Sequence, residues 1–175
     1  MKKISLTLLA LLLIGFVAAQ TEARLMRFPA IHGNQIVFTY AGDLYTVDKT
    51  GGNARKLTND ENGFEMFARF SPDGKQVAFT AQYDGNTEVY IIPADGGVPV
   101  RLTYTATLNR DDVSDRMGPN NIVMTWRNTA PEVVFRSRWR SFNPFIGQLC
   151  TVGLNGDVPA QLPVPRGGFV AGRVL

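Results

Sequence analysis

Short apolar segments alternate with turn-forming residues along most of the chain, and this pattern predicts strands. Segments 35–39, 76–80 and 132–135 are rich in β-branched and aromatic residues, and turns containing Gly, Pro, Asn or Asp separate the apolar segments. Beyond the N-terminal apolar run, no stretch keeps a 3.6-residue apolar period. The sequence therefore predicts an all-β chain with little helix.

The predicted strands recur as copies of one unit. Tyr45 returns as Tyr90, and the Gly-Gly and Leu-Thr pairs at 51–58 return at 96–103, so the offset is 45 residues in each case. Segment 35–39 matches 76–80 at an offset of 41, which leaves four additional residues in the second hairpin, around Gln82 to Thr87. A weaker third copy spans 132–162 and has a longer hairpin still.

Short antiparallel strands repeated every 40 to 60 residues or so predict propeller blades of about four strands each. The turn at 71–74, Ser-Pro-Asp-Gly, opens the second unit, the Asp84-Gly85 turn reverses it, and Asp95-Gly96-Gly97 turns it again. A β-sandwich also uses short strands, but its turns would not carry the same residues in the same order.

The N-terminus has the pattern of a secretory signal peptide at residues 1–19. Lys2 and Lys3 precede an apolar run from Ile4 to Val17, and small residues follow up to Ala19. The run is shorter than the roughly 20 residues that cross a bilayer, which favours a signal peptide over the alternative, a permanent membrane anchor. We expect an exported, periplasmic or secreted protein with no stable membrane span after cleavage.

Composition then narrows the partners. Removing residues 1–19 takes away two lysines and no acid, so the formal charge falls from +3 to +1, which gives no reason to expect nucleic acid as a partner. The single cysteine, Cys150, cannot form an internal disulfide, and it reads as a small buried residue replacing an aromatic one in a strand.

At this point the segments resemble a known family. Residues 30–38 (AIHGNQIVF) with 41–47 (AGDLYTV), residues 69–75 (RFSPDGK) with 83–90 (YDGNTEVY), and the later segments 136–139 and 161–169 are similar to the N-terminal part of tricorn proteases and their bacterial homologues. The Pro-Asp-Gly turn alone also marks TolB-like and prolyl-oligopeptidase propellers. The His32-Gly33-Asn34 opening combined with the Tyr83 hairpin is more specific.

The resemblance implies a partial β-propeller at 20–175, with about three four-stranded blades (approximately 28–60, 61–105 and 106–165) of a six- or seven-bladed ring. Tricorn-like proteins are long chains whose propellers filter or guide peptides toward a serine-type catalytic core, in the cytoplasm or in exported forms. The implied partners are peptides or unfolded polypeptides, the remaining domains of the parent chain, and further copies in a homo-oligomer. Val170 to Leu175 departs from the expected next turn, which suggests a truncated, frame-shifted or fragmentary chain. The alternative is a periplasmic TolB-like propeller that serves as a protein-binding scaffold.

We expect no catalytic residues and no cofactor in this chain. Its only histidine is His32, it has no Gly-x-Ser-x-Gly motif, and nothing in the sequence brings His32 to Cys150 for a thiol dyad. The acidic group Asp111, Asp112 and Asp115 and the segment Asp84 to Glu88 lack EF-hand spacing, so a solvated loop and a hairpin turn are the expected readings.

Two groups of arginines are candidate binding residues. The resemblance places Arg116 at the second position of an arginine pair that anchors the carboxylate of a peptide's C-terminus, with Asp115 replacing the first; a surface arginine paired with an acid is the alternative. Arg136, Arg138 and Arg140 alternate, so on a strand they would share one face, either as a basic stripe that lines a channel or binds nucleic acid, or as an exposed strand surface.

Overall fold

The computed structural model describes residues 25–60, 63–106, 118–140 and 146–163, and every regular element in these residues is a β-strand. Twelve strands form three four-stranded antiparallel sheets in chain order, here called blades 1, 2 and 3. Blade 1 contains β1 (Arg27–His32), β2 (Gln35–Tyr40), β3 (Asp43–Asp48) and β4 (Arg55–Lys56). Blade 2 contains β5 (Phe64–Phe70), β6 (Gln76–Gln82), β7 (Thr87–Pro93) and β8 (Val100–Arg101). Blade 3 contains β9 (Ile122–Trp126), β10 (Glu132–Ser137), β11 (Gln148–Gly153) and β12 (Ala160–Gln161). The prediction of an all-β chain with three four-stranded units is confirmed.

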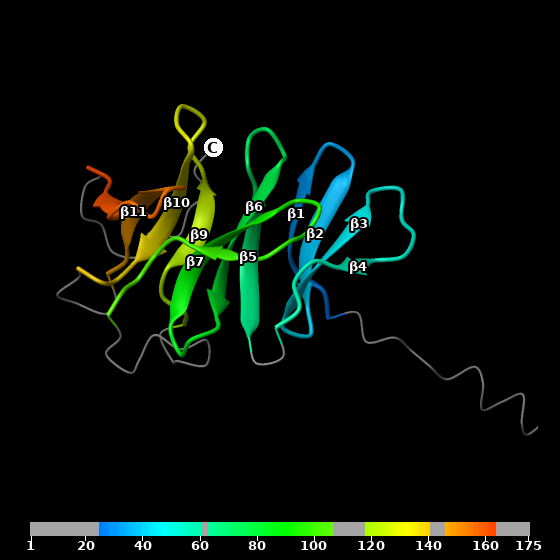
Figure 1. Cartoon of the computed structure of the whole chain (residues 1–175), viewed down its shortest axis with the longest axis horizontal. Coiled ribbons are helices and arrows are strands. Elements are labelled where there is room, and N and C mark those ends of the chain that lie inside the picture. Colours follow the sequence, from blue (N-terminus) through cyan, green and yellow to red (C-terminus); the bar gives the residue numbers. More distant parts are fainter. Residues whose placement is uncertain (1–24, 61–62, 107–117, 141–145, 164–175) are drawn as a thin grey trace, which may run out of the picture.

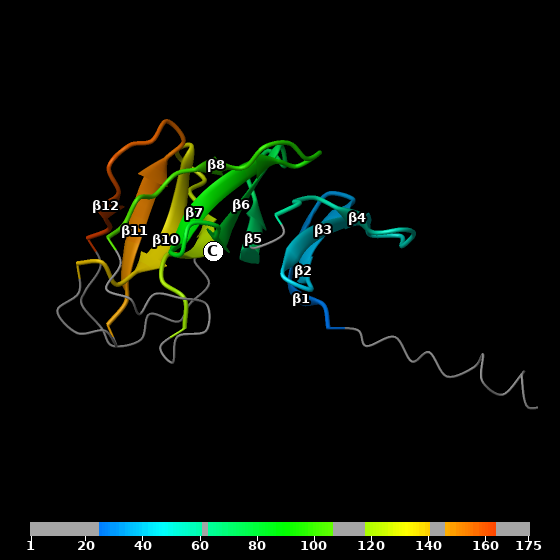
Figure 2. The ribbon, with the colours of Figure 1, turned by 60° about the horizontal axis from the view of Figure 1, so that its bottom comes forward.

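The blades stand side by side like the leaves of a fan (Figures 1 and 2). Their first strands, β1, β5 and β9, contact one another in sequence, while the short strands β4, β8 and β12 form the opposite edges of the sheets. The described residues do not form the two facing sheets of a β-sandwich. The arrangement is that of propeller blades around a common axis.

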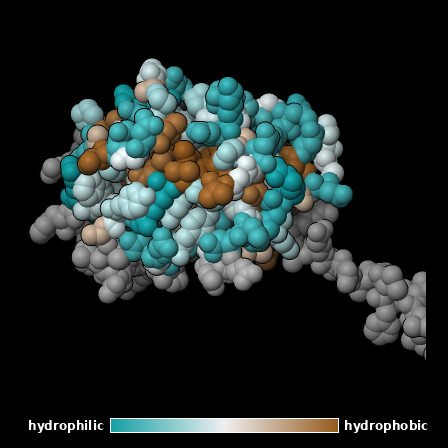
Figure 3. Space-filling view, in the orientation of Figure 1, coloured by the Kyte–Doolittle hydropathy of each residue, from teal (hydrophilic) through white to brown (hydrophobic). Residues whose placement is uncertain are grey.

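The hydrophobic core consists of two clusters, one between each pair of neighbouring blades. The cluster between blades 1 and 2 is built from residues of both sheets: Val37, Leu44, Leu57, Ala68, Val77, Phe79, Ala81, Tyr90, Ile92 and Ala94. The cluster between blades 2 and 3 contains Ala78, Val89, Ile91, Leu102, Val123, Trp126, Val133, Phe135, Cys150 and Val152. Alternate side chains of β6 and β7 enter opposite clusters, so both faces of blade 2 are buried. Figure 3 shows hydrophobic residues in a band across the middle of one face of the molecule, with hydrophilic residues on both sides of the band.

The hairpin lengths follow the repeat offsets. In blade 1, Tyr40 pairs with Asp43 across a two-residue turn in which Ala41 and Gly42 both have positive φ angles. In blade 2 the ladder continues by one more pair, Gln82 with Thr87, and the loop between them has four residues. The extension of the second hairpin around Gln82 to Thr87 is therefore confirmed.

Both β1 and β5 carry a bulge at the same place in the repeat. The register of each strand with its neighbour shifts there, and Phe28 and Phe67 adopt φ angles of 51° and 58°. Their rings lie 4.4 Å apart between centroids, which joins the first strands of blades 1 and 2. Among the residues that the structure describes, no helix has the length and apolar character of a membrane span.

Candidate functional site

The repeated Leu-Thr pairs attach each chain segment after the outer strand back to the third strand of its own blade. The amide N of Leu57 donates to the carbonyl O of Leu44, and that of Leu102 donates to Val89, both at 2.8 Å. In return, the amide N of Leu44 donates to Oγ1 of Thr58 at 3.0 Å, and the amide N of Val89 donates to Oγ1 of Thr103 at 2.9 Å. The repeat therefore preserves hydrogen-bonding roles as well as apolar positions.

An ion pair follows the same 45-residue offset. Lys56 Nζ lies 3.0 Å from Asp43 Oδ2 in blade 1, and Arg101 Nη2 lies 3.0 Å from Glu88 Oε1 in blade 2. In blade 3, Gln148 directly precedes Leu149 and so holds the place of the acidic residue. Gln161 pairs with Cys150 and so holds the place of the basic residue. The third blade thus has two neutral amides where the first two have opposite charges.

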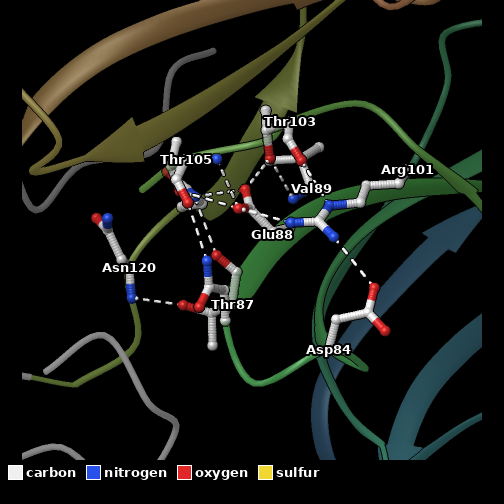
Figure 4. A network of polar contacts seen from close by, with 10 residues as sticks. Asp84, Thr87, Glu88, Val89, Arg101, Thr103, Thr105 and Asn120 are labelled. Carbon is white, nitrogen blue, oxygen red and sulfur yellow. Dashed lines mark hydrogen bonds and ion pairs between the residues drawn. The ribbon is translucent and has the colours of Figure 1, made fainter. Parts of the chain in front are cut away.

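Glu88 is the centre of a buried polar network between blades 2 and 3 (Figure 4). Its side chain is fully buried. The carboxylate accepts hydrogen bonds from Arg101, from the Thr103 hydroxyl, and from the backbone and hydroxyl of Thr105 at 2.7 and 3.0 Å. Asn121 of blade 3 donates a further bond at 2.9 Å. A buried charge is tolerable when it is paired and hydrogen-bonded in this way, and no oxygen of Glu88 is left to act on a ligand.

Two adjacent asparagines connect this network to blade 3. Asn121 Nδ2 also donates to the carbonyl of Thr87 at 3.0 Å, and the amide N of Asn120 donates to Oγ1 of Thr87 at the same distance. Oδ1 of Asn120 accepts from the amide N of Arg138 at 2.8 Å. Asn120 and Asn121 therefore join the entrance of β9 to both neighbouring hairpins.

Glu65 makes the corresponding connection between blades 1 and 2. Its carboxylate accepts from the amide N of Leu44 at 2.8 Å, from the hydroxyl of Tyr83 at 2.7 Å, and from the Thr58 hydroxyl. Burial raises the pKa of this carboxyl, since the hydrogen bonds that favour the ionised form offset only part of the cost of desolvation. Sequence reasoning missed both Glu65 and Asn121.

His32 lies on the surface beside a groove of about 480 Å³ at one end of blade 1. Its ring packs on Gly74 of the Ser-Pro-Asp-Gly turn and lies 5.9 Å from Phe70 between ring centroids. Cys150 is buried in blade 3, opposite Phe135, in the place that Tyr45 and Tyr90 occupy in the other blades. The reading of Cys150 as a replaced aromatic is confirmed, and His32 and Cys150 belong to different blades.

The alternating arginines do not form one exposed strand face, so that interpretation was wrong. β10 ends at Ser137, and Arg138 is 8% exposed, with Nη2 donating to the carbonyl of Gly118 at 2.9 Å. Burial, and then the charge of Arg138, lowers the pKa of the half-buried Arg136. Arg140 is exposed and its guanidinium carbon lies 4.0 Å from the centroid of the Trp139 ring. The chain turns after Ser137, and the strand periodicity ends with it.

The remaining candidates divide between the described residues and the rest. Arg116, Asp111, Asp112 and Asp115 lie outside the described residues. The segment Asp84 to Glu88 belongs to the β6–β7 hairpin, as expected, with its turn before Thr87 and its last two residues in β7, and Asp84 binds Arg101 at 3.1 Å. Within residues 25–60, 63–106, 118–140 and 146–163, no group of three or more His, Cys, Asp or Glu side chains could hold a metal ion.

Comparison with solved structures supports the fold. The crystal structure of the tricorn protease aligns with a TM-score of 0.64 at 22% sequence identity, covering 79% of this chain and 13% of that one. The crystal structure of TolB from Acinetobacter baumannii aligns with a TM-score of 0.57 at 20% identity, covering 78% of this chain and 31% of TolB. Three consecutive four-stranded blades with adjoining first strands define a β-propeller protein.

Sequence relatives identify the particular family. The family model of the tricorn protease N-terminal beta propeller domain matches residues 23–173. Tricorn protease homolog 1 of Streptomyces coelicolor is 37% identical over 141 residues, and the tricorn protease of Thermoplasma acidophilum is 32% identical over 79 residues. This chain belongs to the tricorn N-terminal propeller family. The matched region covers 79% of this chain but only 13% of the Streptomyces relative, and 43% of this chain but 7% of the Thermoplasma relative.

Proposed function

We propose that this chain is a non-catalytic segment of the first propeller of a tricorn-like serine peptidase, and that it guides or filters peptide substrates for a catalytic core outside the chain. The observation that carries this proposal is the family match over residues 23–173 together with the small share of the relative's length that is covered. The buried side chains of Glu65 and Asn121 hold neighbouring blades together, and this structural role supports a non-catalytic segment.

The first test is the gene itself and its full-length product. Reading the sequence downstream of residue 175 should reveal a PDZ-like segment and a serine peptidase core, and the full-length protein should cleave peptides. A stop codon after one closed propeller would contradict the proposal. It would support a second candidate, a TolB-like protein-binding scaffold, which the structural likeness to TolB favours.

Arg116 is the proposed substrate-binding residue of this segment, where its guanidinium would bind the carboxylate at a peptide's C-terminus. In the full-length protein, Arg116→Ala should lower turnover of peptides with a free C-terminus and leave C-terminally amidated peptides unaffected. Arg127→Ala is the matched control, because Arg127 forms a surface ion pair with Glu132 at 2.8 Å. If Arg116→Ala left the turnover of both peptide classes unchanged relative to the unmodified protein, this role would be removed.

We also propose that the protein is exported and cleaved near Ala19. The basic start and short apolar run of residues 1–19 support this location. N-terminal sequencing of the mature protein from the periplasm or medium tests it: a mature start near Gln20 supports export, and an intact Met1 in the cytoplasm contradicts it.

A further inference from the structure

The two connections between neighbouring blades share one plan and differ by one charge. Glu65, near the start of β5, pairs with Ala81 of β6. Asn121 directly precedes β9, whose first residue, Ile122, pairs with Arg136 of β10. By this register, Asn121 holds the position in blade 3 that Glu65 holds in blade 2. Each residue stands at the start of its blade and reaches back to the third strand and the Leu-Thr segment of the preceding blade. One of them is an acid and the other is a neutral amide.

The charges around Glu65 do not compensate it. From β3 and β4 it faces Asp43 and Lys56, but Lys56 is bound to Asp43 at 3.0 Å, and the Asp43 charge disfavours ionisation of Glu65. From the β6–β7 side it faces the hydroxyl of Tyr83, which in turn lies in the field of Asp60 and packs edge-on against Tyr90. Glu65 itself is 1% exposed.

The connection between blades 2 and 3 contains no such uncompensated negative charge. Its carboxylate, Glu88, is bound by Arg101 at 3.0 Å, and the residue that reaches across from blade 3 is the uncharged Asn121. Asp84 is 71% exposed and binds the same arginine from outside. The buried groups of this second connection therefore carry one negative and one positive charge.

We propose that the connection between blades 1 and 2 acts as a pH-sensitive latch: the contacts of Glu65 with blade 1 are intact while Glu65 is protonated and loosen as Glu65 ionises. The connection between blades 2 and 3 stays intact over the same pH range. Opening the latch would separate blade 1 from blade 2 and leave blades 2 and 3 packed together.

The direction follows from linkage. Burial raises the pKa of Glu65 above its ordinary value, so the closed connection favours the neutral carboxyl. Its contribution to stability is fully present below that ordinary value and is lost as the pH rises through the raised pKa. Because one proton is involved, the opening equilibrium changes by at most about tenfold per pH unit. The neutral carboxyl can keep Oε1 as the acceptor of the Tyr83 hydroxyl, while Oε2 carries the proton and donates it to the Thr58 oxygen.

Hydrogen exchange on the complete chain tests the latch. Amide protection of segment 35–48 should be divided by that of segment 132–137 at each pH between about 5 and 8, because the ratio cancels the intrinsic pH dependence of exchange. We expect the ratio to fall with rising pH, by up to about tenfold per unit within the titration window. A ratio independent of pH in the unmodified chain would overturn the proposal.

Two variants decide whether Glu65 is the group responsible. Glu65→Gln reproduces the chemistry of Asn121 and should abolish the pH dependence of the ratio; an unchanged slope would overturn the assignment. Tyr83→Phe keeps the ring and removes a donor that favours the ionised carboxyl, so the fall should move to higher pH. This second variant keeps the proposal testable if Glu65→Gln does not fold, since an unmoved or lowered transition would contradict it.

Discussion

Asn121 of blade 3 donates a 2.9 Å hydrogen bond to the buried carboxylate of Glu88 in blade 2. The same amide nitrogen also reaches the carbonyl of Thr87 and the hydroxyl of Thr105, at 3.0 and 2.8 Å. The two N–H groups of one side chain are thus shared among three acceptors of the neighbouring blade.

Replacing Asn121 by Ala should destabilise the chain by about 1–3 kcal/mol, because buried acceptors in blade 2 lose a donor. The free energy of unfolding from urea titration measures this. Asn155→Ala is the control, since Asn155 is exposed and should change stability by less than about 0.5 kcal/mol. Equal effects of the two substitutions would show that the Asn121 bonds contribute nothing net.

Arg101 should matter far more than its repeat partner Lys56. Arg101→Met leaves the fully buried Glu88 carboxylate without its cation, which costs about 3–5 kcal/mol. Lys56→Met breaks an ion pair whose lysine side chain is 37% exposed, and such pairs contribute about 0–1 kcal/mol. Thermal unfolding of the two variants, side by side, should show the larger loss for Arg101; the opposite order would contradict the structure.

Gly74 is restricted twice, by its backbone and by its neighbour. It has a φ of +71°, and a Cβ there would overlap the ring of His32. Gly85 has a φ of +86° with open space around it. Gly85→Ala should therefore show only the backbone cost, about 1–2 kcal/mol, and Gly74→Ala should cost more.

The double variant His32→Ala, Gly74→Ala separates the two effects at Gly74. Removing the imidazole should restore the part of stability lost to the overlap and leave the backbone cost in place. A double variant no more stable than Gly74→Ala alone would mean that His32 moves aside freely. Chemical denaturation of the four chains, unmodified, single and double, completes the cycle.

Blade 1 presents on its outward face an aromatic layer that is covered in blade 2. Phe38 and Tyr45 stack at 6.0 Å between centroids, as Phe79 and Tyr90 do at 5.9 Å, but Tyr40 beside them is 39% exposed. On the same face, Ile31 is 62% exposed. We expect the isolated chain to self-associate through this surface.

The measurement is light scattering after size-exclusion chromatography over a range of concentrations. Tyr40→Lys together with Ile31→Lys should reduce the mass of the associated species. Val98→Lys is the control, because Val98 is 83% exposed but lies outside this face. Unmodified chain that elutes as a monodisperse monomer at every concentration would contradict the expectation.

The repeat fold was predictable because the same residues recur at fixed offsets along the chain. Tyr45 and Tyr90 occupy matching positions in the third strands, and the Leu-Thr pairs close each blade in the same way. The connections between blades were not predictable, since Glu65 follows Leu57 by eight residues whereas Asn121 follows Leu102 by nineteen, and the two residue types differ. Only the strand register shows that they are equivalent. A search for polar residues at the start of each unit's first strand could have singled them out as candidates.

The arginine stripe illustrates the opposite error. Alternation predicted a shared face for Arg136, Arg138 and Arg140, but it held only as far as the strand continued. The amide N of Arg138 donates to the side chain of Asn120 rather than to a neighbouring strand, and the arginine is buried beside Gly118. Side-chain periodicity cannot show where a strand ends.

The four additional residues in the second hairpin have an effect at a distance from the turn they lengthen. Blade 1 turns directly from Tyr40 to Asp43, whereas the longer loop of blade 2 begins with Tyr83 and brings its hydroxyl within 2.7 Å of Glu65. An insertion that looks like tolerated surface variation thus adds a phenol to the boundary with the preceding sheet. Shortening that loop to match the first unit would remove a hydrogen bond that holds Glu65 within blade 2, and Glu65 is the residue that reaches Leu44 and Thr58 of blade 1. A change in turn length would therefore alter how firmly the two sheets hold together.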